Sequence, residues 1–253
     1  MGIARDWDGA TYDLVSAPME MLGREVLARL DLRGDEVVLD AGCGSGRITA
    51  ALLERVPGGR VIAVDGAPSM IEAARARLGE RPNLELLVAD LCALDIGGRR
   101  VDAVLSTATF HWIDDHATLF ARLRGALRDG GVMAAQCGGN GNIEGIHAAA
   151  DTVGRSDPFA AHLAGWRGPW RFARASETED LLRAAGFTTA RCRLEQRPVT
   201  TDDPVNYYRN IILGAHLGQL PVALRDAFVE AVLGRLPEPS VIPYVRLNID
   251  ATA

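Results

Sequence analysis

Lysine is absent from this 253-residue chain, so all 27 of its basic residues are arginines. Without lysine the chain has no Schiff-base nucleophile and no phosphate-binding lysine of a P-loop. The arginines are scattered along a chain of net charge −6, and no basic stripe is available for a nucleic-acid backbone. We therefore expect no nucleic-acid partner.

Cysteines and long apolar runs are also scarce. The four cysteines, Cys43, Cys92, Cys137 and Cys192, lie far apart and include no C-x-x-C pair, which argues against a disulfide framework or a zinc ribbon. The first residues have no apolar secretory region, and no run is long enough to cross a bilayer. These absences predict reduced thiols, a cytoplasmic location and no membrane partner, and they leave a homodimer open.

The first half of the chain alternates short apolar runs with amphipathic segments. The expected strands are residues 36–40, 60–65, 84–90, 101–106 and 131–137. Because parallel strands need crossover connections, this alternation predicts a doubly wound α/β fold with a mostly parallel sheet. After residue 138 the pattern becomes irregular, which favours a mainly helical cap inserted after the fifth strand, and residues 244–253 alternate like a final strand.

The stretch VVLDAGCGSGRIT (37–49) joins the first strand to a helix through three glycines. Gly42, Gly44 and Gly46 lie where the backbone must turn sharply and approach a ligand closely. Their G-x-G-x-G spacing differs from the dinucleotide fingerprint G-x-G-x-x-G. Asp40, directly before the turn, favours a cationic ligand over a pyrophosphate.

Acids stand at the ends of three consecutive expected strands, as Asp40, Asp65 and Asp90. Asp65 follows the glycines by about twenty residues, where an acid can accept hydrogen bonds from ribose hydroxyls. Met70, on the first turn of the next helix, could cover a flat ring. For each aspartate alone, a helix N-cap or a solvated loop is the alternative interpretation.

Two histidines and two aspartates fall within residues 111–116. His111 and His116 are five residues apart across a loop, unlike the i, i+4 pair of a zinc-binding helix, so we predict no metal site. Asp114 or Asp115 is the expected helix N-cap, with His116 pointing outward. We interpret His111 as a substrate contact or general base beside Trp112; the alternative is that the tryptophan packs in the core and the histidine caps a loop.

The sequence resembles the class I S-adenosylmethionine-dependent methyltransferases, whose D-x-G-C-G-x-G signature matches Asp40 to Gly46. WDGATY near the start, ATFHWIDDH (108–116) and VIPYVRLNIDA near the end also resemble the trans-aconitate methyltransferase group. The resemblance implies S-adenosylmethionine as cofactor, no metal and a small-molecule acceptor. The cofactor contacts that it implies are Asp40, Gly42, Cys43, Gly44, Gly46, Asp65, Gly66, Met70, Asp90, Leu91, Thr107 and Tyr12.

We therefore predict one methyltransferase domain with a Rossmann-like, seven-stranded sheet. Its expected parts are an N-terminal helical lid (1–32), a cofactor-binding core (33–140), a substrate cap (141–175 and 200–238) and the last helix and strands (176–199 and 239–253). The expected substrate contacts are Trp7, Tyr12, His111, Trp112 and Tyr207, with His111 as the catalytic candidate. The predicted reaction is O-methylation of a carboxylate or hydroxyl. The alternatives are a nucleotide-dependent oxidoreductase and a cofactor-binding protein without methyl transfer.

Overall fold

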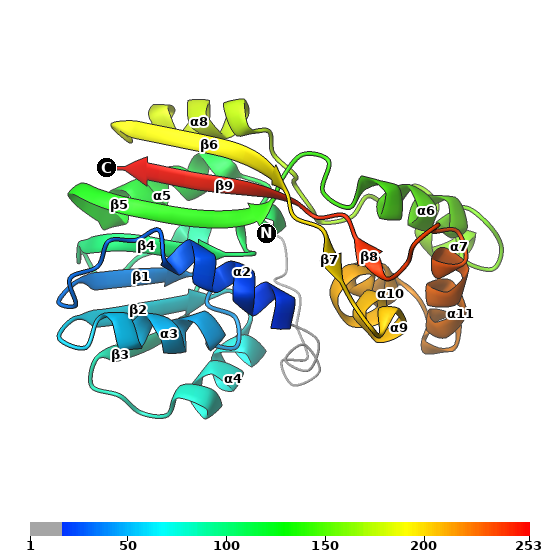
Figure 1. Ribbon diagram of the computed structural model, residues 1–253, viewed down its shortest axis with the longest axis horizontal. Coiled ribbons are helices and arrows are strands. Elements are labelled where there is room, and N and C mark those ends of the chain that lie inside the picture. The colour runs from blue at the N-terminus through cyan, green and yellow to red at the C-terminus, as the bar shows by residue number, and fades with distance from the viewer. Residues whose placement is uncertain (1–16) are drawn as a thin grey trace.

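The computed structural model describes residues 17–253 and contains a seven-stranded sheet in the order β3-β2-β1-β4-β5-β9-β6 (Figure 1). Strands β3, β2, β1, β4 and β5 pair in parallel, and β9 runs antiparallel between β5 and β6. The strands are β1 Val37–Ala41, β2 Arg60–Asp65, β3 Leu84–Val88, β4 Val101–Thr107, β5 Leu127–Gly138, β6 Thr189–Gln196 and β9 Val245–Thr252. The predicted mostly parallel α/β fold is confirmed.

Helices cover both faces of this sheet. They are α2 Ala17–Leu27, α3 Arg47–Arg55, α4 Pro68–Leu78, α5 His116–Ala126 and α8 Ala175–Ala184, with short 3-10 turns η1 Leu91–Ala93 and η2 Phe110–Trp112. None of the helices in the described part of the chain is long and apolar enough to cross a membrane.

The central strands are mostly apolar because each of their faces packs against helices. Val38 and Val61 are buried with α2, α3 and α4, whereas their neighbours Leu39 and Ile62 are buried with α5 and α8. Strands buried on both faces show continuous apolar runs rather than alternation. At roughly 1.5–3 kcal/mol for each fully buried aliphatic side chain, this burial is a main source of the sheet's stability.

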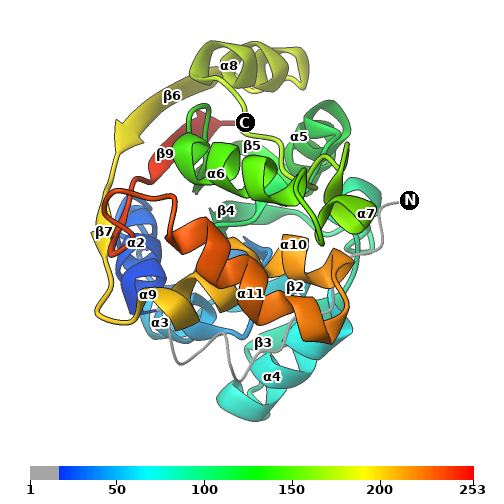
Figure 2. The ribbon, with the colours of Figure 1, turned by 90° about the vertical axis from the view of Figure 1, so that its right-hand side faces the viewer.

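A second group of helices forms a separate unit, called the cap below. It comprises α6 Glu144–Gly154, α7 Ala160–Leu163, α9 Pro204–Tyr207, the π-helical turn η3 Tyr208–Ile212, α10 Gly214–Gln219 and α11 Val222–Leu233. Two short antiparallel strands, β7 Val199–Thr200 and β8 Val241–Ile242, lie in the segments that connect the cap with the sheet. These helices share a hydrophobic core of their own. The cap lies beyond the carboxyl-terminal ends of the parallel strands (Figures 1 and 2), the edge at which open α/β sheets bind ligands.

Candidate active site

The glycine turn after β1 adopts backbone conformations that favour glycine at three positions. Gly42, Gly44 and Gly46 have φ angles of 88°, 53° and 81°. A Cβ atom on Gly42 would lie 2.1 Å from the hydroxyl oxygen of Thr109, so the turn packs directly against the loop after β4. A Cβ atom on Gly44 would meet nothing within 4 Å. The turn therefore presents open backbone to a ligand at Gly44 and is fixed at Gly42.

Asp65, at the end of β2, holds this turn in place. The N–H of Gly44 donates to its Oδ2 atom and the N–H of Ala67 to its Oδ1 atom, each at 2.9 Å. Burial raises the pKa of Asp65, and these two N–H donors, with that of Gly66, oppose the rise. Each carboxylate oxygen can accept a second hydrogen bond, because a carboxylate offers about four acceptor positions.

Asp40 lies behind the same turn and is only 1% exposed. The Thr49 hydroxyl donates to its Oδ2 atom at 2.7 Å. Burial, with a further contribution from the charge of Asp65, raises the pKa of Asp40 to about 7, and the Thr49 hydrogen bond opposes this rise. The negative charges of Asp40 and Asp65 repel each other across the turn, so a positively charged ligand bound there would be favoured.

The other cofactor contacts expected from the sequence lie near the ends of β1 to β4. Met70 and Leu91 are both buried, at 5% exposure. The N–H of Ala89 donates to the carbonyl of Asp65 at 3.0 Å, which brings the segment after β3 beside the end of β2. Asp90 is exposed and is the N-cap of η1, where its side chain accepts the N–H of Cys92 at 2.8 Å. The alternative helix-cap interpretation therefore holds for Asp90, and the cap leaves its second oxygen available.

Three further residues expected to contact the cofactor are Cys43, Gly66 and Thr107. Cys43 is buried, and this burial raises the pKa of its thiol well above the usual value, so it is not a thiolate nucleophile at neutral pH. Gly66 is exposed and directly follows Asp65. Thr107 ends β4, and its carbonyl accepts the Thr109 hydroxyl at 3.0 Å.

His111 lies in η2 and is nearly buried, at 9% exposure. Its Nδ1 atom accepts the N–H of Gly138, the last residue of β5, at 3.3 Å. Burial, assisted by the positive charge of Arg246, lowers the pKa of His111 to about 3. The ring is therefore neutral at physiological pH and carries its proton on Nε2, so it is suited to donate a hydrogen bond and poorly suited to act as a general base.

His116 corrects one expectation from the sequence. It is 1% exposed rather than pointing outward, because its Nε2 atom pairs with the carbonyl of Phe110 at 2.9 Å. Asp115 is the N-cap of α5, as predicted, and accepts the N–H of Thr118 at 2.9 Å. Across residues 17–253, no three histidine, cysteine or acidic side chains are grouped as metal ligands.

Arg246 is a buried cation that sequence reasoning did not select. It is 4% exposed and is the only buried arginine among residues 17–253. In the sheet it pairs with Gly138, the residue that binds His111. Its Nε atom donates to Gln136 Oε1 at 3.3 Å, and its guanidinium lies 5.7 Å from the centre of the Tyr244 ring. The final strand alternates apolar and polar residues, so its pattern placed Arg246 among the polar residues and gave no signal that its side chain is buried.

The expected substrate contacts are distributed over several parts of the molecule. The half-buried Trp112 ring lies 5.1 Å from the His111 ring. Tyr207 is buried in the cap core, where its hydroxyl pairs with that of Tyr244 at 3.0 Å. Tyr207 is thereby connected to Arg246 through one intervening side chain. Trp7 and Tyr12 lie outside the described residues.

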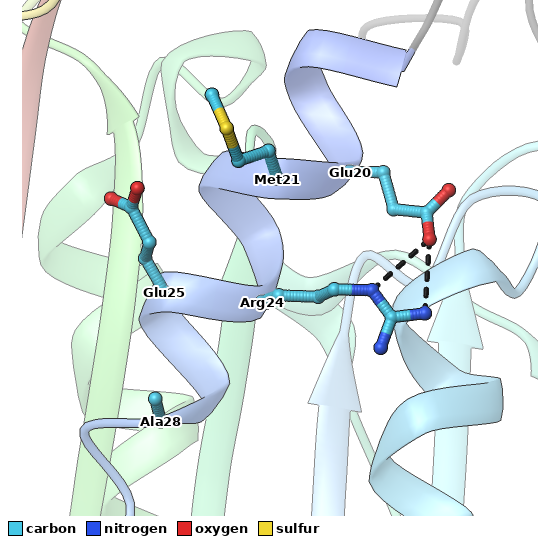
Figure 3. Close-up of a pocket in the computed structure, with 5 residues that line it drawn as sticks. All are labelled: Glu20, Met21, Arg24, Glu25 and Ala28. Carbon is cyan, nitrogen blue, oxygen red and sulfur yellow. Dashed lines mark hydrogen bonds and ion pairs between the residues drawn. The ribbon is translucent and has the colours of Figure 1, made fainter.

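A surface hollow of about 590 Å³ runs along α2 and is lined by Glu20, Met21, Arg24, Glu25 and Ala28 (Figure 3). None of the expected site residues lines it. One residue of this hollow, Glu20, forms an ion pair at 2.9 Å with Arg47, the first residue of α3. This ion pair fixes α2 against the helix that begins at the glycine turn.

Comparison with known proteins gives concordant matches. The sequence model of a family described as a methyltransferase domain matches residues 38–131. Trans-aconitate 2-methyltransferase of Methylobacterium radiotolerans is 34% identical over 244 residues, covering 93% of this chain and 92% of that protein. Malonyl-[acyl-carrier protein] O-methyltransferase of Xylella fastidiosa is 34% identical over 155 residues, covering 59% of this chain and 52% of that protein.

Two solved structures share the fold at low sequence identity. YcgJ of Bacillus subtilis is 17% identical with a TM-score of 0.63, covering 91% of this chain and 97% of that one. Phosphoethanolamine N-methyltransferase 2 of Haemonchus contortus, solved with S-adenosyl-L-methionine, is 17% identical with a TM-score of 0.64, covering 96% of this chain and 56% of that one.

Proposed function

The chain belongs to the trans-aconitate 2-methyltransferase family of S-adenosylmethionine-dependent methyltransferases, and we propose that it methylates a carboxylate oxygen of a small organic acid. The observation that carries this proposal is a buried cation, Arg246, beside the neutral hydrogen-bond donor His111. Both are linked to Gly138 at the carboxyl-terminal end of β5. A carboxylate is the acceptor whose charge and geometry match that pair.

The cofactor side of the proposal is supported by the acids around the glycine turn. The bound cofactor supplies an electrophilic methyl group on a positively charged sulfur. The charges of Asp40 and Asp65 favour its cationic groups, and Asp65 has acceptor positions remaining for ribose hydroxyls. Gly44 allows close approach of the backbone. Met70 and Leu91 are assigned to the adenine ring, and Asp90, Gly66, Cys43 and Thr107 to the rim of the site.

The acceptor side requires no general base. A carboxylic acid is already ionised near neutral pH, and a histidine with a pKa of about 3 would not remove a proton there in any case. In the proposed mechanism Arg246 and the Nε2–H of His111 hold one carboxylate oxygen and leave the other to attack. The protein's contribution is then alignment and exclusion of water.

Several assignments in the proposal rest on the sequence alone. These are contacts from Trp7, Tyr12 and Trp112 to the substrate, the division into lid, core and cap, a cytoplasmic location and a homodimer. For Tyr207 we propose an indirect role, because its hydroxyl supports Tyr244 beneath Arg246.

The test is a methylation assay with methyl-labelled S-adenosylmethionine and a panel of small mono-, di- and tricarboxylic acids. Methyl esters release volatile methanol on treatment with base, whereas N-methyl and C-methyl products do not. We expect base-labile label with at least one acid. Label in a base-stable product would refute carboxylate methylation.

Arg246→Met should raise the KM for the acid by roughly 30-fold or more, because a desolvated charged partner is lost. Its affinity for S-adenosylmethionine, measured by calorimetry, should change less than about threefold, which also verifies folding. Arg246→Lys should recover part of the loss, since it restores the charge without the fork. Arg155→Met, at a side chain 71% exposed on α6, is the matched control and should behave like the wild type. An unchanged KM in Arg246→Met would remove Arg246 from the site.

A further inference from the structure

One face of β9 carries a row of polar side chains in the middle of the sheet (Figure 1). Successive side chains of a strand point to opposite faces, so Arg246, Asn248 and Asp250 share one face, and the apolar residues between them lie in the main core on the other. Arg246 is 4% exposed and Asn248 is 2% exposed. Buried polar side chains cost free energy unless they are hydrogen-bonded, so the partners of this row decide what it can do.

Gln136 of β5 connects this row to the proposed acceptor site. It is 4% exposed and lies opposite Asn248 in the antiparallel pairing of β5 with β9. Its Oε1 atom accepts the Nε–H of Arg246 at 3.3 Å, and its Nε2 atom donates to Asn248 Oδ1 at 2.9 Å. Two residues further along β5, the N–H of Gly138 donates to His111. Gln136 is therefore a direct hydrogen-bond partner of the arginine that we assign to the substrate.

Charged groups determine which end of each amide faces which neighbour. An amide can be turned end for end unless its partners only donate or only accept. Asn248 has one partner of each kind: Arg29 donates to its Oδ1 atom at 2.6 Å, and its Nδ2 atom donates to Glu195 Oε2 at 3.1 Å. Because Oδ1 of Asn248 also faces Gln136, the glutamine must turn its NH₂ group toward it. The carbonyl oxygen of Gln136 consequently faces Arg246.

The far end of this network is firmly held. Arg29, in the segment after α2, donates to the backbone carbonyls of Ala135 and Ile249 at 2.8 and 3.0 Å. It also forms an ion pair with Asp250 at 3.0 Å. Turning the Gln136 amide around would place two NH₂ groups or two oxygens against each other, or would break a bond to this guanidinium. The orientation of Gln136 is therefore set by residues that lie away from the proposed acceptor site.

The contact with Gln136 orients the guanidinium of Arg246 without neutralising it. A carboxylate in the place of the amide would form a buried ion pair and cancel the charge, whereas an amide oxygen accepts the Nε–H and leaves the cation in place. The positive charge of Arg246 acts on His111, because it assists burial in lowering the pKa of that ring. The Tyr244 ring lies 5.7 Å from the guanidinium. Because the guanidinium is planar, fixing its Nε–H also fixes the direction of its two terminal nitrogens.

We propose that Gln136 is a positioning residue for the acceptor carboxylate: it holds the guanidinium of Arg246 in the orientation that binds the substrate and keeps its charge available. This inference rests on the proposed carboxylate methylation and on the part of Arg246 in it. Gln136 acts through the arginine and does not itself contact the substrate. Asn248 and Arg29 fix the end of the amide that Arg246 meets.

Gln136→Met removes both polar groups of the amide and keeps an unbranched side chain of similar length. The probe is the acid of the panel above that gives the fastest base-labile methylation. We expect its KM to rise about tenfold, because a hydrogen bond to a charged group is lost. The kcat should stay within about threefold of wild type, because the carboxylate loses its charge in the transition state and depends less on Arg246 there. Gln196→Met, at an exposed position on β6, is the matched control and should behave like the wild type.

A double-mutant cycle distinguishes positioning from a general structural effect. If Gln136 acts through Arg246, adding Gln136→Met to Arg246→Met should change KM by less than about twofold. A structural effect that is independent of Arg246 would multiply KM by the same factor in both backgrounds. Calorimetry with S-adenosylmethionine, with an affinity within about threefold of wild type, verifies that each variant is folded.

Gln136→Glu keeps the shape of the side chain and tests the charge. The new carboxylate would pair with Arg246 and compete with the carboxylate of the substrate. We expect a KM at pH 8 at least about tenfold above that of the wild type. This variant also decides the matter if Gln136→Met does not bind S-adenosylmethionine.

The outcomes separate the inference from the proposed function. A higher KM in Gln136→Met that disappears in the Arg246→Met background supports the inference. An unchanged KM in folded Gln136→Met, the same factor in both backgrounds, or a wild-type KM in Gln136→Glu overturns it, and the proposed function stands if Arg246→Met still raises KM. An unchanged KM in Arg246→Met, or no base-labile methylation of any acid by protein that binds S-adenosylmethionine, refutes the acceptor site as proposed and the inference with it.

Discussion

Replacing Asp40 with asparagine should stabilise the cofactor-free protein against unfolding and lower its affinity for the cofactor. Asp40 is 1% exposed, and its pKa is raised from 3.8 to about 7, chiefly by burial. Such a rise corresponds to at most about 4 kcal/mol of destabilisation when the carboxyl is ionised, at 1.36 kcal/mol for each pKa unit. The asparagine side chain would keep an oxygen to accept the Thr49 hydroxyl while removing the buried charge.

The sign of the pH dependence follows from linkage. Because the pKa of Asp40 is higher in the folded state, the folded protein binds more protons between about pH 4 and pH 7. This group's contribution to the free energy of unfolding therefore falls as the pH rises through that window. In Asp40→Asn that dependence should be missing, so the variant should gain most over wild type at pH 8 and little at pH 4.

Urea unfolding of the protein without cofactor, at pH 8 and pH 5, measures the stability difference, and calorimetry at pH 7.5 measures cofactor binding. We expect Asp40→Asn to gain about 1–4 kcal/mol at pH 8 and to bind S-adenosylmethionine at least about tenfold more weakly, because a charged partner is lost. Asp129→Asn, at a side chain 95% exposed, is the control and should lie within about 0.5 kcal/mol of wild type. A variant less stable than wild type at pH 8 would show that the buried charge is compensated within the folded protein.

Two further predictions concern the turn and the histidine. Gly42→Ala should destabilise the protein by about 1–3 kcal/mol in urea unfolding, because φ is 88° and the new methyl group would overlap Thr109. Gly125→Ala, in open space on α5, is the control and should stabilise the protein by about 0.5–1 kcal/mol. Equal effects of the two substitutions would refute the packing argument. Because the pKa of His111 is about 3, the pH profile of kcat/KM with an acid substrate should show no ionisation of this ring between pH 5 and pH 8. His111→Phe should lower kcat and leave the shape of that pH profile unchanged. A change of slope near pH 6.5 that disappears in the variant would restore the general-base role.

The geometry of the glycine turn, on the proposed cofactor side, was predictable from the sequence because its features are local. A strand followed by glycines with positive φ has few possible conformations, and the carboxyl ends of consecutive parallel strands must meet at one edge. Asp40, Asp65 and the turn are therefore brought together by chain order alone. Asp115 was predictable as an N-cap for the same reason, since its partner, the N–H of Thr118, is three residues away.

The geometry of the proposed acceptor side was less predictable because its contacts join distant segments. His116 was expected at the surface, but its ring is held by the Phe110 carbonyl, and nothing in the local spacing specifies that the loop turns back to offer it. Arg246 is buried because the antiparallel pairing of β9 with β5 sets it opposite Gly138, more than 100 residues earlier. The rings of His147 on α6 and His216 on α10 have centres 6.1 Å apart, although α7, α8, β6, β7, α9 and η3 lie between the two helices in the chain. Periodicity predicts the helices but not which of their faces meet.

The charges of the two halves of the site explain how this arrangement would bind charged reactants and release neutral products. In the proposed function Asp40 and Asp65 bind on the cofactor side, and Arg246 binds on the acceptor side. In the proposed reaction a cation and an anion become a neutral thioether and a neutral ester. Charge neutralisation is favoured where water is excluded, because the protein then no longer has to solvate either charge. Arg246 also loses its charged partner once the ester forms, so the ester should bind more weakly than the acid. The same charged residues that bind the reactants therefore promote release of the methyl ester.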